Sequence, residues 1–368
     1  MGINIHIVDS ELPTLPISGE TSLESVQVLK ALTLAHRFLA ELKGMAKSMP
    51  NEGILISSQT LQEAKDSSAI ENIITTHDEL FRVGDIKAEK INLAAKEVEN
   101  YRIALLESYR QTREGGLIRV ADILHLQSLI EPNKPGIRKI PGTVIGNATT
   151  KEVIYTPPQH PDEIGRLLDN LVSYINDDEL SELDPLIKMA IIHHQFESIH
   201  PFYDGNGRAG RIINIIYLVR SGLLDLPILY LSRYIVRTKG EYYRLLQSVR
   251  DHDDWEEWVL YILKGIEETA KETIEFINQI KTLVFETKRR MRRELPAIYS
   301  QELLNNLFLH PYTKVQFVID QIGVSRITAT KYLNQLAEHG FVEKHKVGRS
   351  NYYINQPLVR LIRQQEEG

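Results

Sequence analysis

The chain has 368 residues, of which 42% are hydrophobic and 25% charged, a composition typical of globular proteins with room for two or three structural units. It contains no cysteine, which excludes disulfides, thiolate metal sites and cysteine nucleophiles, and a net charge of −6 argues against a protein that coats nucleic acid. We see no secretory leader and no apolar run of the roughly 18 residues that a membrane span needs, so we expect a cytoplasmic protein without a membrane partner.

Helical periodicity dominates the chain. Apolar residues recur every three or four positions over residues 23–46, which predicts a long amphipathic helix. The same pattern predicts further helices at 88–113, 120–130, 161–175, 185–198, 207–220, 239–249 and 254–293. One short β signal interrupts them: residues 143–145 and 153–155 flank a polar stretch, which predicts a small hairpin. The sequence thus indicates a mainly α fold with one hairpin.

The end of the chain follows a different pattern. A helix from 313, a turn at Gly323 and a second helix over 325–339 precede two strands at 341–344 and 352–354, the outline of a winged helix-turn-helix. Residues 311–355 hold six Lys and Arg against three Asp and Glu, a local charge of +3, which makes DNA a candidate partner. We therefore expect three units, at 1–100, 101–285 and 295–368.

The most informative segment is residues 200–211, with the sequence HPFYDGNGRAGR. Asp184 and Pro185 are typical of a helix start, and that helix must end before Pro201, while a second helix begins near Gly207. The connection therefore points into a helix N-terminus, where backbone N–H groups and the helix dipole favour a phosphate group.

Side chains suited to phosphate chemistry surround this connection. Arg208 and Arg211 lie three residues apart on one helix face and can clamp phosphate oxygens, and the Asp204 carboxylate can hold magnesium against the same phosphates. A histidine titrates near neutral pH, so His200 can take a proton from an attacking hydroxyl. Each feature alone is common in turns and on solvated helix faces; together, within twelve residues, they predict a nucleotide site.

At every fixed position this segment matches the H-P-F-x-D-G-N-G-R-x-x-R signature of Fic proteins, and the chain resembles a Fic-type protein adenylyltransferase. The resemblance implies a helical Fic bundle that transfers AMP from ATP, with Mg²⁺, to a Tyr, Thr or Ser hydroxyl of a target protein or of itself. It makes His200 the general base, Asp204 the residue that binds magnesium through the phosphates, and Arg211 the partner of the γ-phosphate. The implied ATP and phosphate contacts are Asp204, Gly205, Asn206, Gly207, Arg208, Ala209, Gly210 and Arg211.

The resemblance assigns two more regions. The hairpin would be a flap that registers an extended target segment by strand addition, although a structural hairpin explains the same residues equally well. Its flap residues would be Thr143, Val144, Ile145 and Gly146. Tyr242 and Tyr243 occupy the place of an adenine pocket, while tyrosines at helical spacing are more often core residues.

Upstream, residues 67–72 read SSAIEN. Ser68 and Glu71 fit a capping box, which predicts the start of a helix running on towards Leu80. The stretch also resembles the inhibitory motif of Fic proteins, [S/T]-x-x-x-E-[G/N], with Ser67, Glu71 and Asn72 at its fixed positions. That resemblance implies that Glu71 pairs with Arg211 and so blocks the place of the γ-phosphate, an intramolecular autoinhibition.

Other functions use the same residues. A Fic enzyme can use a different nucleotide donor, or remove AMP with Glu71 positioning a water. The chain can also be a DNA-binding regulator whose Fic domain senses nucleotide; such a sensor should survive His200→Ala. A metal enzyme using His193, His194 and His200 is disfavoured, since neighbouring histidines point to different helix faces. A homodimer is the default expectation for assembly.

Overall fold

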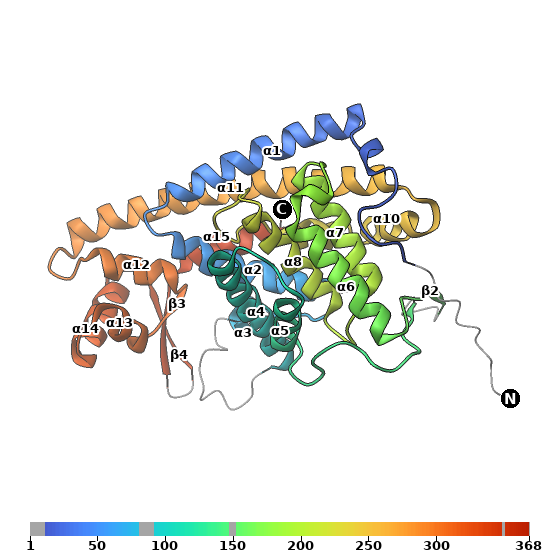
Figure 1. Ribbon diagram of the computed structural model, residues 1–368. Helices are drawn as coiled ribbons and strands as arrows, with labels where there is room; N and C mark the ends of the chain where they lie inside the picture. Colours follow the sequence, from blue (N-terminus) through green and yellow to red (C-terminus); the bar gives the residue numbers. More distant parts are fainter. Residues whose placement is uncertain (1–11, 81–91, 147–151, 348–349, 368) are drawn as a thin grey trace.

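The computed structural model describes residues 12–80, 92–146, 152–347 and 350–367, and these residues form a mainly α-helical protein (Figure 1). The α-helices are α1 (Val26–Lys47), α2 (Glu52–Ile70), α3 (His77–Leu80), α4 (Leu93–Gly115), α5 (Val120–Ile130), α6 (Pro161–Asn176), α7 (Pro185–Ile199), α8 (Asn206–Arg220), α9 (Leu231–Arg237), α10 (Lys239–His252), α11 (Trp255–Glu294), α12 (Gln301–Leu309), α13 (Val315–Ile322), α14 (Arg326–Glu338) and α15 (Gln356–Glu367). Two 3₁₀ turns, η1 (Glu20–Leu23) and η2 (Asp178–Leu180), accompany them. The strands are β1 (Ile145–Gly146), β2 (Val153–Tyr155), β3 (Tyr312–Thr313), β4 (Glu343–Val347) and β5 (Ser350–Ile354).

All eight helices expected from periodicity are present, most with ends within a few residues of the expected ones. The helix α2 was not expected as an element of its own. Its buried residues include Gln59, Thr60, Gln62 and Glu63, so polar side chains occupy core positions and the amphipathic pattern is lost. A helix that is buried on most of its surface gives no periodic signal, and α2 is such a helix.

The long helix α11 lies at the centre of the helix packing. The helix α1 lies along it, and α7, α9, α10, α12 and α15 also pack against it (Figure 1). Trp258 of α11 is fully buried and donates its Nε1 proton to the carbonyl of Ala190 in α7, at 2.8 Å. On the other side of α7, α8 packs against α4 and α5, so the connection between α7 and α8 is held by helices on several sides.

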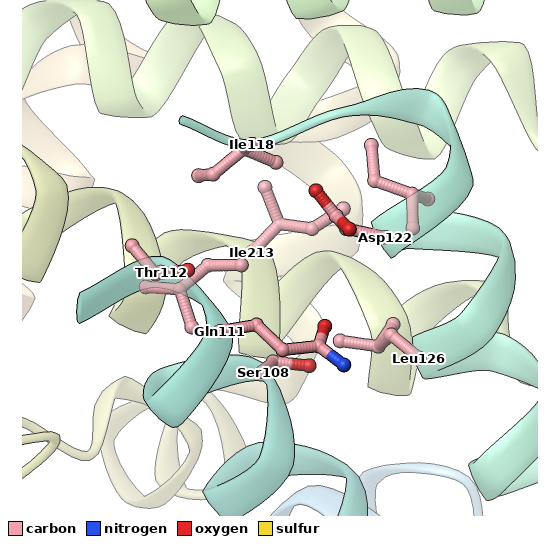
Figure 2. A pocket seen from close by; sticks show the side chains of 9 residues that line it. Ser108, Gln111, Thr112, Ile118, Asp122, Leu126 and Ile213 are labelled. Atoms are coloured by element: carbon pink, nitrogen blue, oxygen red, sulfur yellow. The ribbon is translucent and has the colours of Figure 1, made fainter. Parts of the chain in front are cut away.

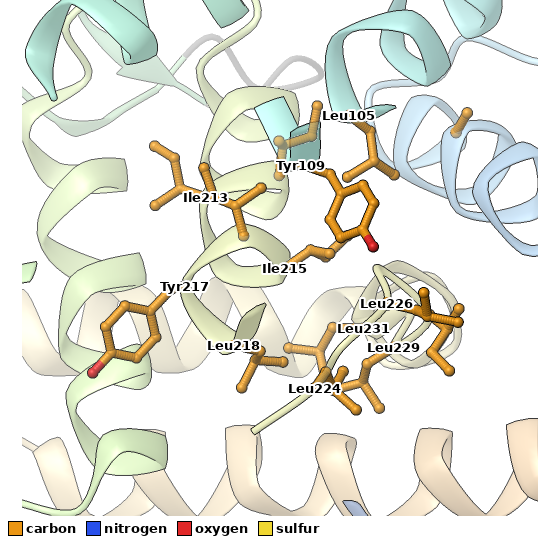
Figure 3. Packing of buried hydrophobic residues seen from close by; sticks show 14 of the residues in the cluster. Leu105, Tyr109, Ile213, Ile215, Tyr217, Leu218, Leu224, Leu226, Leu229 and Leu231 are labelled. Atoms are coloured by element: carbon orange, nitrogen blue, oxygen red, sulfur yellow. The ribbon is translucent and has the colours of Figure 1, made fainter. Parts of the chain in front are cut away.

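Apolar side chains surround α8 in particular. Figure 3 shows Ile213, Ile215 and Leu218 of α8 among Leu105 and Tyr109 of α4 and the leucines of the segment before α9. Burial of such side chains is the main favourable contribution to folding, and here it fixes α8 in position. One hydrophobic cluster extends from Leu15 to Ile362 and contains side chains from all three expected units, so their division at 1–100, 101–285 and 295–368 stays a prediction.

The C-terminal elements follow the order expected for a winged helix-turn-helix. α13 and α14 are joined by a turn at Gly323, whose φ of 77° lies in the left-handed region that glycine tolerates. β4 and β5 form an antiparallel pair, and β3 adds to β5, giving the strand order β3-β5-β4. The helix α12 of this unit packs against α2, where Ser57 Oγ donates to the carbonyl of Leu309 at 3.0 Å.

Across the described residues, no helix is both long and apolar enough to cross a membrane.

Candidate active site

The site is built on the connection between α7 and α8. Asp184 caps the start of α7 by accepting a hydrogen bond from the Leu186 N–H at 2.8 Å. The helix ends at His200, whose φ of 46° is left-handed, a rare conformation for a residue with a side chain. Gly205, with φ 80°, occupies the N-cap position of α8, where a left-handed residue is needed.

A side-chain staple closes this loop. The Asn206 Oδ1 accepts from the Phe202 N–H and its Nδ2 donates to the Phe202 carbonyl, both at 2.9 Å. The Phe202 ring is fully buried and packs against Phe196 of α7, with 6.2 Å between the ring centroids. Both polar atoms of the Asn206 side chain therefore hold the loop in shape. The backbone N–H of Asn206 remains available to a ligand.

His200 is partly buried at the end of α7, and its Nδ1 has no hydrogen-bond partner. Burial, reinforced by the charges of Arg138 and Arg250, lowers the pKa of His200 to about 4. The imidazole is therefore neutral at physiological pH, the form that can accept a proton.

Arg208 is buried among carboxylates. Its Nη2 donates to Glu131 Oε1 at 2.5 Å and lies 3.5 Å from Asp204 Oδ1, and Glu97 Oε2 is 3.8 Å from Nη1. The Nε and Nη1 atoms of Arg208 are buried without a hydrogen-bond partner. Buried guanidinium N–H groups left unsatisfied favour an additional anion at this place.

Arg211, one turn further along α8, faces α2. It is 2% exposed, its Nε donates to Ser67 Oγ at 2.8 Å, and its Nη2 donates to the Ser67 carbonyl and to Glu71 Oε1 at 2.9 and 3.0 Å. Burial alone would lower the pKa of Arg211, but neighbouring charges, Glu71 first among them, raise it above its ordinary value. The expected contact between Glu71 and Arg211 is thus present in the structure.

Residues 67–72 end a helix rather than start one, so the capping-box interpretation of Ser68 and Glu71 is wrong. Ser67 and Ser68 belong to the last turn of α2, and Glu71 is its C-cap. Asn72 follows with φ 63°, in the left-handed region, where asparagine and glycine are the residues that fit with least strain. The last position of the motif is therefore explained by helix termination.

Two glycines let the site close tightly. A Cβ at Gly207 would clash with Glu71 Oε1, so the absent side chain is what brings the Glu71 carboxylate against the N-terminus of α8. A Cβ at Gly210 would lie 2.7 Å from Glu197 Oε1 and 3.1 Å from the Phe196 ring, so Gly210 permits the close crossing of α7 and α8. Ala209 between them is fully buried in the core.

The two expected adenine-pocket tyrosines have different surroundings. Tyr242 is 1% exposed and its hydroxyl is hydrogen-bonded to His193 Nε2 at 2.9 Å, so it is a core residue. Tyr243 is 46% exposed and packs edge-on against Tyr242, so its ring is the one available to a ligand. His194 is likewise buried, with Nε2 3.2 Å from the Leu246 carbonyl. No group of three or more potential metal ligands occurs among the described residues.

The hairpin is shorter than expected. β1 and β2 pair antiparallel, with Ile145 opposite Tyr155 and Gly146 opposite Val153, while Thr143 and Val144 precede the strand. Part of the predicted turn, residues 147–151, lies outside the described residues. Tyr155 donates its hydroxyl to the Ser198 carbonyl at 3.0 Å, which attaches the hairpin to the end of α7.

A separate small pocket lies behind α8, between α4 and α5 (Figure 2). Ser108, Thr112, Asp122 and Ile213 are among its lining residues, and its cavity volume of about 10 Å³ has room for a single water molecule. It is too small for a nucleotide.

Several residues of the site carried no sequence signal. Arg138, Glu131 and Arg250 reach it from distant segments, through hydrogen bonds to His200, Arg208 and Ser198 respectively. None of the three lies in a motif that the sequence analysis singled out, so only the tertiary structure identifies them.

Three family models match the chain in succession. The Fic/DOC family N-terminal model matches residues 29–110, the Fic/DOC family model matches 70–218, and the model of the C-terminal domain of SoFic-like protein adenylyltransferases matches 283–358. The chain belongs to the Fic/DOC family, as residues 200–211 indicate.

Relatives and solved structures agree with this assignment. The protein adenylyltransferase fic-1 of Caenorhabditis elegans is 28% identical over 175 residues, 46% of this chain and 31% of the relative. A probable protein adenylyltransferase of Aquifex aeolicus is 37% identical over 81 residues, 22% of this chain and 24% of the relative. The match thus spans less than a third of either curated relative.

Solved structures show the same fold. A Fic family protein from Desulfovibrio desulfuricans G20 has a TM-score of 0.57 at 18% identity, with 90% of this chain and 96% of that one covered. Residues 134–508 of Fic-1 from C. elegans have a TM-score of 0.53 at 23% identity, with 70% and 75% covered. The mainly α Fic fold is therefore confirmed.

The left-handed conformation of Asn72 predicts a stability effect. Asn72→Ala should lower the free energy of unfolding by about 1 kcal/mol, because alanine is strained at positive φ. Asn72→Gly is the matched control and should be close to wild type. Urea unfolding of the three proteins tests this; equal stability of the alanine and glycine variants would contradict it.

Buried ionisable groups make stability depend on pH. Burial lowers the pKa of His193 and of His194 to about 3, whereas an unfolded histidine titrates near 6.5. The contribution of these two histidines to the free energy of unfolding is complete above pH 6.5 and is lost as the pH falls towards 3. Burial raises the pKa of Glu63 to about 8 and that of Glu197 to about 7, so these two lose their contribution as the pH rises above 4.5. Below pH 4.5, therefore, the two glutamates no longer offset the loss of stability that protonation of the two histidines causes.

His194→Gln should make the free energy of unfolding less steep between pH 4.5 and 3.5, by about 1.4 kcal/mol per pH unit, because one proton fewer is taken up on unfolding. Denaturant unfolding at a series of pH values measures the slope. His252, which is exposed, provides the control: His252→Gln should leave the slope unchanged. An unchanged slope in His194→Gln would contradict the assignment.

Proposed function

We propose that the protein is an autoinhibited protein adenylyltransferase that transfers AMP from ATP to a hydroxyl of a target protein. The observation that carries the proposal is the Glu71 carboxylate, which lies 3.0 Å from Arg211 and against the N-terminus of α8. A helix N-terminus beside a buried arginine is an anion site. Glu71 is an internal anion in that site, and the γ-phosphate of ATP is the external anion that would replace it.

The surroundings of α8 suit a triphosphate. Backbone N–H groups of the first turn, Asn206 to Arg208, have no intrahelical partner by geometry and point to the loop. Arg208 offers two buried nitrogens without hydrogen-bond partners, and Arg211 would take the γ-phosphate. Tyr243 offers an exposed ring to the adenine.

Asp204 fits a magnesium ion that arrives with the nucleotide. Its side chain is 52% exposed at the apex of the loop, with Oδ1 accepting the Gly205 N–H at 2.7 Å. Magnesium typically takes one or two carboxylates together with substrate phosphates, which agrees with a single acidic residue here. When bound, the ion would neutralise phosphate charge; Asp204 would hold it beside the loop.

The reaction then follows from the positions of these groups. The hydroxyl oxygen of the target attacks the α-phosphorus of ATP and forms the new O–P bond, while the bond to the bridging oxygen breaks and pyrophosphate leaves. His200, neutral at physiological pH, accepts the hydroxyl proton. Most of the rate gain comes from orientation and from charge compensation by Arg208, Arg211 and the α8 N-terminus. The hairpin at 143–155 would align the target segment by strand addition.

Removal of the internal anion should activate the enzyme. Glu71→Gly should increase transfer of label from α-labelled ATP to protein by at least about tenfold, because Arg211 becomes free for the γ-phosphate. Adding Arg211→Ala or His200→Ala should abolish the gain. The assay is run on the purified chain, which reports self-modification, and with lysate as a source of targets. Equal labelling of wild type and Glu71→Gly would contradict autoinhibition, and labelling that survives His200→Ala would contradict the role of the base.

We also propose, as a second function, that the C-terminal unit binds DNA. Ile327 at the start of α14 is 83% exposed, and Arg326 and Lys331 are exposed on the same helix. The N-terminal part of the second helix is what a helix-turn-helix presents to base edges, where an apolar side chain can contact a thymine methyl group. Lys344 and Lys346 on β4 are exposed as well and suit phosphates. Arg349 of the expected wing lies outside the described residues.

A duplex of mixed sequence should bind the full chain at 50 mM salt and bind markedly more weakly at 200 mM, because phosphate contacts release counterions. The double variant Arg326→Ala/Lys331→Ala should reduce both the affinity and the salt slope. Fluorescence anisotropy measures this, with Arg110→Ala/Arg166→Ala, on other helices, as the charge-matched control. Absence of binding at 50 mM salt, or equal loss in both double variants, would contradict the proposal.

Cytoplasmic location, a homodimer and the division into three units remain predictions.

A further inference from the structure

The segment that leads into the hairpin is braced against the loop that carries His200. Residues 137 and 202 form an antiparallel bridge, and the Arg138 N–H donates to the Pro201 carbonyl at 3.0 Å. Two further backbone N–H groups of the segment donate to the Tyr203 hydroxyl, at 2.9 and 3.2 Å. The base-bearing loop and the approach to the hairpin therefore form one hydrogen-bonded unit.

The Arg138 side chain reinforces this unit from inside. It is 0% exposed, and its Nε donates to the His200 carbonyl at 2.9 Å. Its Nη2 donates to the Pro158 carbonyl, just after the hairpin, and lies 3.5 Å from the Ile199 carbonyl. The carbonyls at the end of a helix lack intrahelical partners and carry partial negative charge. Arg138 thus caps α7 at the residue that presents the imidazole, and it joins both ends of the hairpin region to that cap.

No described carboxylate forms an ion pair with Arg138, so backbone carbonyls are its main compensation. Burial accordingly lowers the pKa of Arg138. The charged groups that act on His200 come from three directions: Arg138, Arg250 of α10 and Glu71 at the end of α2. Arg250 donates to Ser198 Oγ at 3.1 Å, so a second cation lies beside the same helix end. The two arginines together disfavour a third positive charge on the imidazole.

We propose that Arg138 is a positioning residue for adenylyl transfer, which fixes His200 relative to the hairpin through three carbonyl groups and places a positive charge beside the imidazole. Arg138 itself touches no reacting atom. The proposal rests on the function proposed above, because it assigns Arg138 a purpose in that reaction. The His200 imidazole, held by Arg138, can then accept a proton from the target hydroxyl at mildly acidic pH. It also stays aligned with the target segment that the hairpin would bind.

Two substitutions in the Glu71→Gly background separate the two effects. Arg138→Lys keeps a positive charge, but one ammonium group cannot reach three carbonyls in the fork geometry of a guanidinium. Arg138→Gln removes the charge. Both should lower kcat at least about tenfold with little change in KM for ATP, because misplaced groups lose orientation. Only Arg138→Gln should also move the acid limb of the kcat profile upward by about one pH unit. Tyr203→Phe, which leaves Arg138 in place, should keep the parental pH profile. Parental kcat and pH profile in both folded Arg138 variants would overturn the proposal.

A second measurement needs no target protein. Diethyl pyrocarbonate modifies neutral imidazole, and the rate at His200 can be followed by mass spectrometry from pH 7 to 4.5, with exposed His125 as internal reference. In the wild-type chain the rate at His200 should fall by no more than about a quarter over this range, and in Arg138→Gln it should fall by more than half. A wild-type midpoint near 6.5 overturns the proposal. These two rate profiles, together with no transfer by Glu71→Gly, would contradict the proposed function and leave the effect of Arg138 on the imidazole standing.

Discussion

The buried guanidinium of Arg211 is the group on which the rest of the site depends. A buried cation without compensating groups costs several kcal/mol, so an anion beside Arg211 is strongly favoured. In this structure the anion is Glu71, held 3.0 Å away by the end of α2. The γ-phosphate of a nucleotide satisfies the same requirement, so inhibition and catalysis are two ways of compensating one charge. Exchange between them costs much less than exposing the arginine alone, which gives the fold a switch between two occupied states.

The contacts of α2 confine the exchange of Glu71 for a γ-phosphate to the end of that helix. α2 is attached to the site at its C-terminal end, through Ser67 and Glu71, and to α12 near its N-terminal end, through Ser57 and Leu309. Buried polar contacts hold it between: Glu63 of α2 accepts hydrogen bonds from Tyr101 at 2.8 Å and from Ser232. Burial raises the pKa of Glu63 to about 8, so it is largely protonated at neutral pH and adds little charge near Arg211. The Glu71 carboxylate is thus the anion that responds to ligand.

The sequence predicted the loop well because its chemistry is local. The Gly205 conformation and the start of α8 follow from one short motif, and the structure contains both. The contact of Glu71 with Arg211 joins residues 140 apart and was implied only by the resemblance to the inhibitory motif of Fic proteins. The helix α2 could not be predicted by periodicity, since its polar residues lie inside the core. For the same reason the capping-box interpretation failed: Ser68 lies in the buried last turn of a helix that the pattern did not reveal. Arg138 and Glu131 could not be predicted either, because their contacts join segments about 60 to 80 residues apart and no local pattern records them.

Glu71 lies where we expect the γ-phosphate to bind. Crystals of the Glu71→Gly variant, grown with magnesium and a non-hydrolysable ATP analogue, would show the position of that phosphate. We expect a γ-phosphate oxygen within hydrogen-bond distance of the Arg211 guanidinium, where the Glu71 carboxylate lies in the wild-type chain. A nucleotide bound elsewhere, with Arg211 still bonded to Ser67 alone, would contradict it.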